Sequence, residues 1–254
     1  MAEKYDNRIY NRRTRRQTAA VALATAVTVL CAAFFCVRVW ASSPVLPETP
    51  DAGLSYQDSL TFLGDSLTAH LVSREVLTGR RNTTQVWRTA SGMLNLNSEI
   101  TEARIRDPYG GESLTIAEAA AKYKPPVLVI TLGTDWGVSY LGETDFKHAY
   151  RKLICAIREA SPDTILILQS IYPVTESCAV LTNAQIDRAN GWVVELAETE
   201  GCAYLDTCRV LKDESGALAA QYCDSADGIH LNRAAYEVIL AYIRTHAYKG
   251  VESE

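Results

Sequence analysis

Residues 59–68 read SLTFLGDSLT and join a short apolar run directly to the start of a helical pattern. A serine at such a junction, here Ser66, has its hydroxyl at the open edge of a sheet, beside backbone N–H groups that carry the positive end of the helix dipole. That environment suits a nucleophile. Serine is also a common helix N-cap, which is the alternative interpretation of Ser66. The stretch therefore predicts a strand that gives way to a helix.

The same alternation of strand and helix continues along the chain. Short apolar runs bounded by turn residues predict five buried strands, at residues 59–63, 85–88, 127–132, 165–170 and 203–205. Helical patterns cover residues 66–77, 115–123, 144–160, 183–200 and 232–246. This order predicts an α/β domain with a five-stranded, mainly parallel sheet. In such sheets, chemistry gathers in loops at the carboxyl ends of the strands.

The chain begins with a segment that predicts a membrane anchor. Residues 19–37 carry no charged side chain, and roughly 20 such residues in a helix span the hydrocarbon layer. A secretory signal has a shorter apolar run of roughly 7 to 15 residues. Arg38 follows directly, where cleavable signals seldom carry charge. An uncleaved anchor is therefore favoured over a signal peptide, whose cleavage would release a secreted domain.

Four parts follow from this assignment. Residues 1–17 form a basic cytoplasmic tail, 18–40 the transmembrane anchor, 41–55 a proline-rich linker and 56–250 the folded domain. The tail holds an arginine cluster that stays in the cytoplasm by the positive-inside bias. The linker is expected to be an extended tether. We therefore expect a single-pass membrane protein whose domain lies outside the cytoplasm.

Charge is divided unevenly between these parts. The chain has 25 Lys and Arg against 30 Asp and Glu, a net charge of −5. Residues 1–40 hold seven basic and two acidic residues, which leaves 18 basic and 28 acidic residues, or −10, for the rest. A net charge of −10 over the rest of the chain argues against nucleic-acid binding, because phosphate contacts require clustered Lys and Arg. Its cysteines form no zinc pattern, and neither a metal nor an organic cofactor is expected.

A serine nucleophile needs a base, and histidine is the commonest one. The chain has four histidines, at positions 70, 148, 230 and 246. His70 lies one helical turn after Ser66 and is expected to point along the flank of that helix. His230 stands in the loop SADGIHLN, with Asp227 three residues earlier. Such a carboxylate can accept from one imidazole nitrogen and leave the other for the serine proton. The alternative is a helix-capping aspartate followed by an incidental histidine.

Together these residues resemble the SGNH/GDSL hydrolase family of GDSL-like lipases and acylhydrolases. Gly64, Asp65 and Ser66 match the family's first block, and Asp227 and His230 match its last. The resemblance covers roughly residues 60–246. It implies a flavodoxin-like three-layer α/β/α sandwich in a membrane-anchored bacterial ester hydrolase that needs no cofactor. It also implies that Ser66, His230 and Asp227 form a catalytic triad.

The middle blocks of the family supply the groups that hold the oxyanion. The glycine of the second block matches Gly92, and the third block, Gly-x-Asn-Asp, falls on residues 133–136, Gly-Thr-Asp-Trp. The resemblance implies an oxyanion hole made by the backbone N–H groups of Ser66 and Gly92 and by the side chain at position 135. Trp136, in place of the block's aspartate, is expected to line the substrate site together with Thr134.

Asp135 departs from the family, which has asparagine at this position. An ionised carboxylate donates no hydrogen bond, and the loss of one oxyanion donor costs about 2.7 to 4 kcal/mol. Three accounts are open. Burial holds Asp135 protonated and able to donate, another group such as the Thr134 hydroxyl serves instead, or the domain is a weak or inactive relative. The presence of Ser66, Asp227 and His230 favours retained activity.

Residues and location together predict a serine ester hydrolase outside the cytoplasm. The expected substrate is an acylated carbohydrate of the cell envelope, or another small ester, that loses an O-acetyl or short acyl group. Two alternatives use the same fold. One is a glycan-binding module with weak or no catalysis, and the other is an acyltransferase that passes the acyl group to a sugar hydroxyl.

Overall fold

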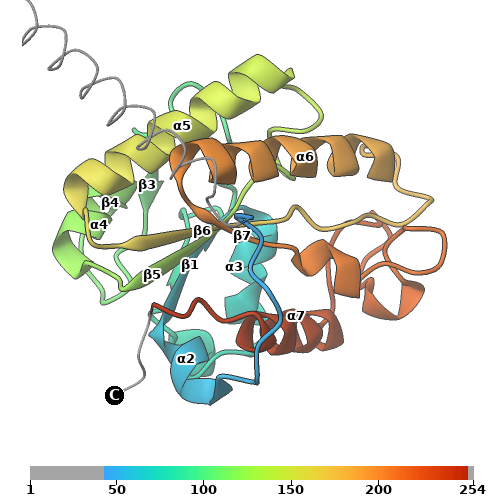
Figure 1. The fold of residues 1–254 in the computed structure, drawn as a ribbon, viewed down its shortest axis with the longest axis horizontal. Coiled ribbons are helices and arrows are strands. Elements are labelled where there is room, and N and C mark those ends of the chain that lie inside the picture. The colour runs from blue at the N-terminus through green and yellow to red at the C-terminus, as the bar shows by residue number, and fades with distance from the viewer. Residues whose placement is uncertain (1–42, 251–254) are drawn as a thin grey trace, which may run out of the picture. The chain divides into compact units, whose positions relative to one another are not determined.

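Five parallel strands form the central sheet of the computed structural model, which describes residues 43–250 (Figure 1). The strands are β1 (Leu60–Gly64), β2 (Val86–Trp87), β5 (Val127–Thr131), β6 (Ile165–Gln169) and β7 (Ala203–Leu205). Their order in the sheet is β2-β1-β5-β6-β7, and all four pairings are parallel. All five predicted strands are thus confirmed.

Helices cover both faces of the sheet, so the domain has three layers (Figure 1). On one face lie α4 (Ile116–Tyr123), α5 (Glu143–Ala160) and α6 (Asn183–Glu200); on the other lie α2 (Gly53–Ser59), α3 (Ser66–Ser73) and α7 (Arg233–Thr245). Successive residues of a strand pack into the hydrophobic cores on opposite faces of the sheet, because side chains alternate across a strand. Leu63 packs on the α5 side and Phe62 on the α7 side. The α/β/α sandwich is confirmed.

The strand order creates a switch point between β1 and β5. Within the sheet, β2 lies next to β1 on one side, and the chain later returns to place β5 next to β1 on the other side. Loops that leave the carboxyl ends of β1 and β5 therefore run in opposite directions and open a crevice, which is where open α/β sheets bind ligands. Ser66 follows β1 at this point, and residues 133–136 follow β5.

Several short elements lie outside the predicted pattern. Two strands, β3 (Arg104–Ile105) and β4 (Leu114–Thr115), pair antiparallel as a separate small sheet, and three 3₁₀ turns occur at η1 (Arg80–Asn82), η2 (Thr207–Val210) and η3 (Ala220–Tyr222). Apart from Ile105, the residues of β3 and β4 are exposed or half-buried, so these two strands leave no continuous apolar run in the sequence. The 3₁₀ turns, of three or four residues, are too short to show a helical period. The helix predicted over residues 66–77 ends at Ser73, and Glu75 then takes a left-handed backbone conformation (φ 55°).

The segment after Ser43 differs from the extended tether expected over residues 41–55. The Tyr204 N–H donates to Pro44 O at 2.7 Å, and the Leu46 N–H donates to Tyr204 O at 2.9 Å. This places residues 44–46 beside β7, at the edge of the sheet. Proline is tolerated at such an edge, because its carbonyl still accepts although it has no N–H. Further along, α2 begins within the range assigned to the linker.

The predicted cytoplasmic tail, residues 1–17, and membrane anchor, residues 18–40, lie outside the described residues. Within residues 43–250, no helix is both long and apolar enough to cross a membrane. Anchoring and orientation across a membrane therefore stay predictions from the sequence.

Gly64 ends β1 at a point where no side chain fits. A Cβ there would stand 2.1 Å from Thr68 Oγ1 and 2.2 Å from the backbone oxygen of Thr131 on the neighbouring strand. We expect Gly64→Ala to lower the free energy of unfolding by about 1 to 3 kcal/mol or more, because the sheet or α3 must shift. Urea unfolding followed by tryptophan fluorescence measures this.

Gly191→Ala is the matched control for that substitution. A Cβ at Gly191, inside α6, meets nothing within 4 Å. Alanine there should raise the free energy of unfolding by about 0.5 to 1 kcal/mol, because glycine weakens a helix interior. If Gly64→Ala were as stable as the wild type, the close approach of β1, α3 and β5 would be wrong.

Candidate active site

Ser66 is the first residue of α3, and it does not cap the helix. The N-cap is Asp65, whose Oδ1 accepts the Leu67 N–H at 3.3 Å. The alternative interpretation of Ser66 as an N-cap is therefore wrong. Its Oγ lies 2.7 Å from Asp135 Oδ1 and 3.4 Å from His230 Nε2. The serine hydroxyl thus has two possible proton acceptors.

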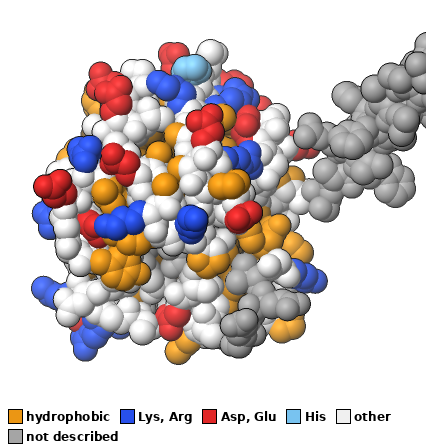
Figure 2. Space-filling model, turned by 90° about the vertical axis from the view of Figure 1, so that its left-hand side faces the viewer, with side chains coloured by type: hydrophobic (Ala, Val, Ile, Leu, Met, Phe, Trp, Pro, Cys, Tyr) orange, Lys and Arg blue, Asp and Glu red, His pale blue; other side chains and the backbone are white. Residues whose placement is uncertain are grey.

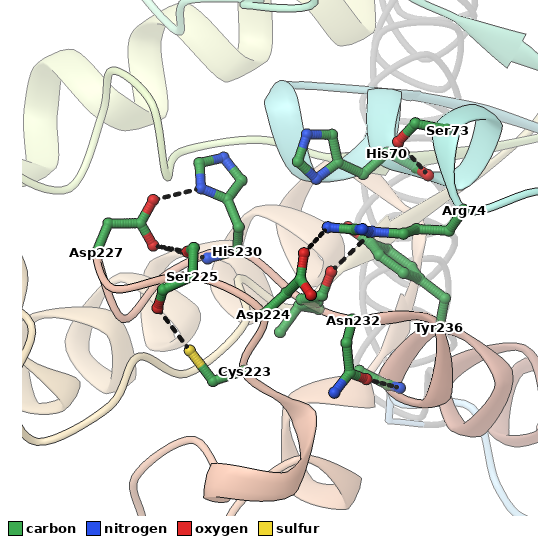
Figure 3. A network of polar contacts seen from close by, with 12 residues as sticks. His70, Ser73, Arg74, Cys223, Asp224, Ser225, Asp227, His230, Asn232 and Tyr236 are labelled. Atoms are coloured by element: carbon green, nitrogen blue, oxygen red, sulfur yellow. Dashed lines mark hydrogen bonds and ion pairs between the residues drawn. The ribbon is translucent and has the colours of Figure 1, made fainter.

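Asp227 and His230 form a close pair on the loop before α7 (Figure 3). His230 Nδ1 lies 2.6 Å from Asp227 Oδ2. The other carboxylate oxygen accepts the Ile229 N–H at 2.8 Å and the His230 N–H at 3.2 Å, and it also accepts the Ser225 hydroxyl. Gly228 turns the chain between them with φ 74°, a conformation that favours glycine. The loop therefore closes on its own carboxylate.

Asp227 stays ionised in this loop. Burial alone would raise the pKa of its carboxyl, but hydrogen bonds from Ser225, Ile229 and His230 outweigh burial and lower the pKa well below the usual range. An ionised Asp227 holds a proton on His230 Nδ1 and leaves Nε2, the nitrogen that faces Ser66, as an acceptor.

Asp135 occupies the other side of Ser66. Its Oδ1 lies 2.7 Å from Ser66 Oγ, and its Oδ2 accepts the backbone N–H of Ser66 at 2.9 Å. That N–H is one of the donors expected to hold the oxyanion. A carbonyl oxygen can use it only after the carboxylate oxygen has moved away. The hydroxyl is also closer to Asp135 than to His230, so the two acceptors compete for its proton.

Asp65 is fully buried and joins the two halves of the site. Besides capping α3, it accepts the Thr134 N–H on Oδ2 at 3.0 Å. Burial and the negative charge of Asp135 raise the pKa of Asp65 to about 7, although N–H groups of Thr134, Leu67 and Asp135 oppose the shift. Sequence reasoning used Asp65 only as part of a block. The signal for its role was its place directly before a helix, where aspartate is a favoured N-cap.

The remaining predicted residues lie at different places around Ser66. Gly92 and Ser66 line the same pocket, and the Gly92 N–H donates to Thr89 O at 3.2 Å within its own turn. Thr134 is buried and reaches the site through its backbone contact with Asp65.

Trp136 directly follows Asp135 in the chain. The residue is 40% exposed, and its ring stacks on that of Tyr140, with ring centroids 4.1 Å apart. Trp136 is not one of the described residues that line the pocket beside Ser66.

His70 is a neighbour of the site that sequence reasoning did not place there. Its ring packs against that of His230, with centroids 4.8 Å apart (Figure 3). Burial lowers the pKa of His70, and electrostatic interactions with His230 and Arg74 lower it further, so the ring is neutral at neutral pH. The spacing of four residues from Ser66 puts both side chains on one face of α3. That spacing was the available signal.

A model of the GDSL-like Lipase/Acylhydrolase family matches residues 62–238 of this chain. Among solved structures, one from Streptococcus pneumoniae, assigned provisionally as a platelet activating factor, aligns with a TM-score of 0.52 and 18% identity over 89% of this chain and 99% of that chain. A GDSL-like lipase from Bacteroides thetaiotaomicron aligns with a TM-score of 0.50 and 17% identity over 74% of this chain and 87% of that one.

A third structure is an active-site mutant of a family two carbohydrate esterase from Clostridium thermocellum, in complex with a cello-oligosaccharide. It aligns with a TM-score of 0.50 and 18% identity over 73% of this chain and 61% of that one. No curated protein is similar enough to this chain to count as a relative. At these identities, the structures establish a common fold.

The raised pKa of Asp65 predicts how stability depends on pH. Its carboxyl binds a proton more tightly in the folded chain (pKa about 7) than at the ordinary value of 3.8. The resulting stabilisation is complete below the ordinary pKa and is lost as the pH rises to about 7. We expect the free energy of unfolding of the wild type, relative to Asp65→Asn, to fall by a few kcal/mol over this range, at about 1.4 kcal/mol per pKa unit.

Urea titrations of both proteins, at the two ends of this pH range, provide the measurement. The side-chain amide in Asp65→Asn can accept one hydrogen bond fewer than the carboxylate, but this loss does not change with pH. The change with pH in the difference between the two free energies of unfolding therefore reports on the titration of Asp65. A difference that does not change with pH would show that Asp65 titrates normally.

Proposed function

The chain belongs to the GDSL-like lipase/acylhydrolase family and is an ester-hydrolysing enzyme, and we propose that Ser66, His230 and Asp227 are its catalytic triad. One observation carries this proposal. His230 stands between the other two residues, with Nδ1 2.6 Å from Asp227 Oδ2 and Nε2 3.4 Å from Ser66 Oγ. The 3.4 Å contact is longer than the ordinary hydrogen bond of about 2.6 to 3.2 Å, but it still brings Nε2 to the Ser66 hydroxyl.

The proposed reaction uses His230 first as a base and then as an acid. Asp227 holds the imidazole in place, Nε2 takes the proton of Ser66, and Oγ forms a bond to the ester carbonyl carbon. The imidazolium gives this proton to the departing alcohol as the ester bond breaks. Water then attacks the acyl-enzyme, with the same imidazole as base, and releases the acid and free Ser66.

We propose that Asp135 restrains this reaction in the free enzyme. A substrate carbonyl must displace its Oδ2 from the Ser66 N–H before the oxyanion can form there. An N–H can only donate, so the oxygen that it contacts acts as an acceptor. This favours a slow hydrolase over the account in which Asp135 supplies a donor to the oxyanion. The same contacts make a glycan-binding module with little catalysis the second candidate.

An acylated carbohydrate of the cell envelope is the substrate class that we propose, reached from an amino-terminal anchor that places the domain outside the cytoplasm. The uncharged run at residues 19–37 supports the location. A carbohydrate esterase among the structures with this fold supports the substrate class. So does the exposed, stacked pair of Trp136 and Tyr140, which offers a flat apolar face close to Asp135 in the chain.

Ser66→Ala tests the nucleophile. We expect it to lower the hydrolysis of p-nitrophenyl acetate by more than about 1,000-fold, because the acyl-enzyme can no longer form. Ser139→Ala is the control, since this exposed hydroxyl only donates to Val180 O and its loss should leave the rate unchanged. Labelling by a fluorophosphonate probe should occur in the wild type and not in Ser66→Ala. A wild type that neither reacts with the probe nor hydrolyses the ester would instead be a binding module.

Asp135→Asn tests whether Asp135 restrains the reaction. The amide can donate to the oxyanion and carries no charge, so kcat should rise by up to about 100-fold, the effect of one oxyanion donor. Asp135→Ala separates the two contributions, because it removes the charge without adding a donor, and it should give the smaller increase. A large loss of activity in Asp135→Asn would show that the carboxylate takes part in the reaction.

A further inference from the structure

A small pocket lies directly beside Ser66 and contains two arginines. Its volume is about 210 Å³. Ser66 and His70 contribute from α3, Arg88 and Gly92 from the segment after β2, and Arg106 from the position after β3. The pocket is therefore continuous with the proposed nucleophile. Its two charged side chains, Arg88 and Arg106, have no role in the proposed reaction.

Arg88 and Arg106 lie next to each other and have no carboxylate partner. The Arg106 N–H donates to Arg88 O at 2.9 Å, so the two backbones are adjacent. Burial and the positive charge of Arg106 lower the pKa of Arg88. The Arg106 side chain donates to a neutral group, Ala90 O, at 3.0 Å. Of the ion pairs formed within residues 43–250, none includes either arginine.

This arrangement is unexpected in so acidic a domain. Carboxylates are in excess outside residues 1–40, and other arginines use them: Arg74 pairs with Asp224, and Arg151 pairs with Glu200 at 2.7 Å. Figure 2 shows basic and acidic side chains mixed over one face of the domain. The positive charges of Arg88 and Arg106 repel each other, and the partial burial of Arg88 adds a desolvation cost. An anion bound between them would remove both costs.

The other residues of the pocket limit what this anion can belong to. Besides the charged groups and His70, the described residues that line it are small, namely alanine, serine and glycine. No large apolar side chain among them offers a surface for a long acyl chain. A pocket of about 210 Å³ is small, which suits the charged end of one sugar unit.

We propose that Arg88 and Arg106 bind a carboxylate or phosphate group of the substrate, so that the enzyme deacylates acidic sugars in preference to neutral ones. This rests on the proposed role of Ser66. A guanidinium fork matches both oxyanions through paired N–H donors. The small, polar lining favours an acidic carbohydrate over a phospholipid. Because Ser66 lines the same pocket, an anion held there would bring an ester on the same sugar unit close to this serine.

Three matched esters test the proposal with the full-length protein in detergent. They are an O-acetylated methyl glucoside, the corresponding glucuronide, which carries a carboxylate, and the corresponding glucoside 6-phosphate. We expect kcat/KM to be on the order of 10- to 100-fold higher for at least one acidic ester, mainly through a lower KM. Whichever acidic ester is preferred identifies the anion.

Arg88→Gln and Arg106→Gln should each reduce this preference severalfold, and the double variant should abolish it. Arg188→Gln is the control, because Arg188 is exposed on α6, away from the residues that line the pocket, and its loss should leave the preference intact. Fluorophosphonate labelling of Ser66 in every variant shows that the site is folded, whatever the substrate.

The outcomes separate this inference from the proposed function. If Ser66 is neither labelled nor active, the proposed function fails. If Ser66 is labelled and active, equal kcat/KM on acidic and neutral sugars would overturn the inference, as would a preference that survives the double variant. Faster hydrolysis of a phospholipid ester than of any sugar ester would overturn it in favour of a lipid substrate.

Discussion

The buried carboxylate of Asp65 is the contact on which the site depends. One oxygen caps α3 through the Leu67 N–H, and the other binds the Thr134 N–H after β5. Because a single side chain holds both loops, Ser66 and Asp135 meet at the carboxyl edge of the sheet. Gly64 makes this possible, since a larger residue would separate β1 from α3 and β5. This position removes the Asp65 carboxyl from solvent, and burial together with the charge of Asp135 raises its pKa to about 7.

That geometry gives the Ser66 hydroxyl two neighbours with opposite effects. His230, held by the ionised Asp227, offers the acceptor that a serine nucleophile requires. Asp135 is closer to the hydroxyl and also engages the backbone N–H that an oxyanion needs. The same loop connection that assembles the site thus brings in the group that opposes it. In the proposed reaction, the substrate must displace Asp135 from the Ser66 N–H, so the rate depends on how tightly the substrate is held. The adjacent pocket with Arg88 is where we propose that this binding energy arises.

Much of the fold could be predicted because buried parallel strands leave continuous apolar runs in the sequence. The five strands and the helices between them follow that pattern. The small sheet of β3 and β4 was missed because its residues, apart from Ile105, are exposed or half-buried and leave no continuous apolar run. The position of residues 44–46 beside β7 was missed for another reason. Three prolines predict an extended chain, but whether that chain stays in solvent or pairs with a sheet edge depends on the edge that is available.

The sequence by itself determined what depends on near neighbours in the chain. This includes the serine at the strand-to-helix junction and the contact of Asp227 with His230, three residues apart. The family blocks, which occur in order along the chain, added the prediction that Gly92, Asp135 and His230 lie around Ser66. Only the tertiary structure decided which atoms meet across 69 residues between Ser66 and Asp135, or that Arg88 and Arg106 share a pocket beside the serine. Such contacts depend on strand order and loop path, which local periodicity does not specify.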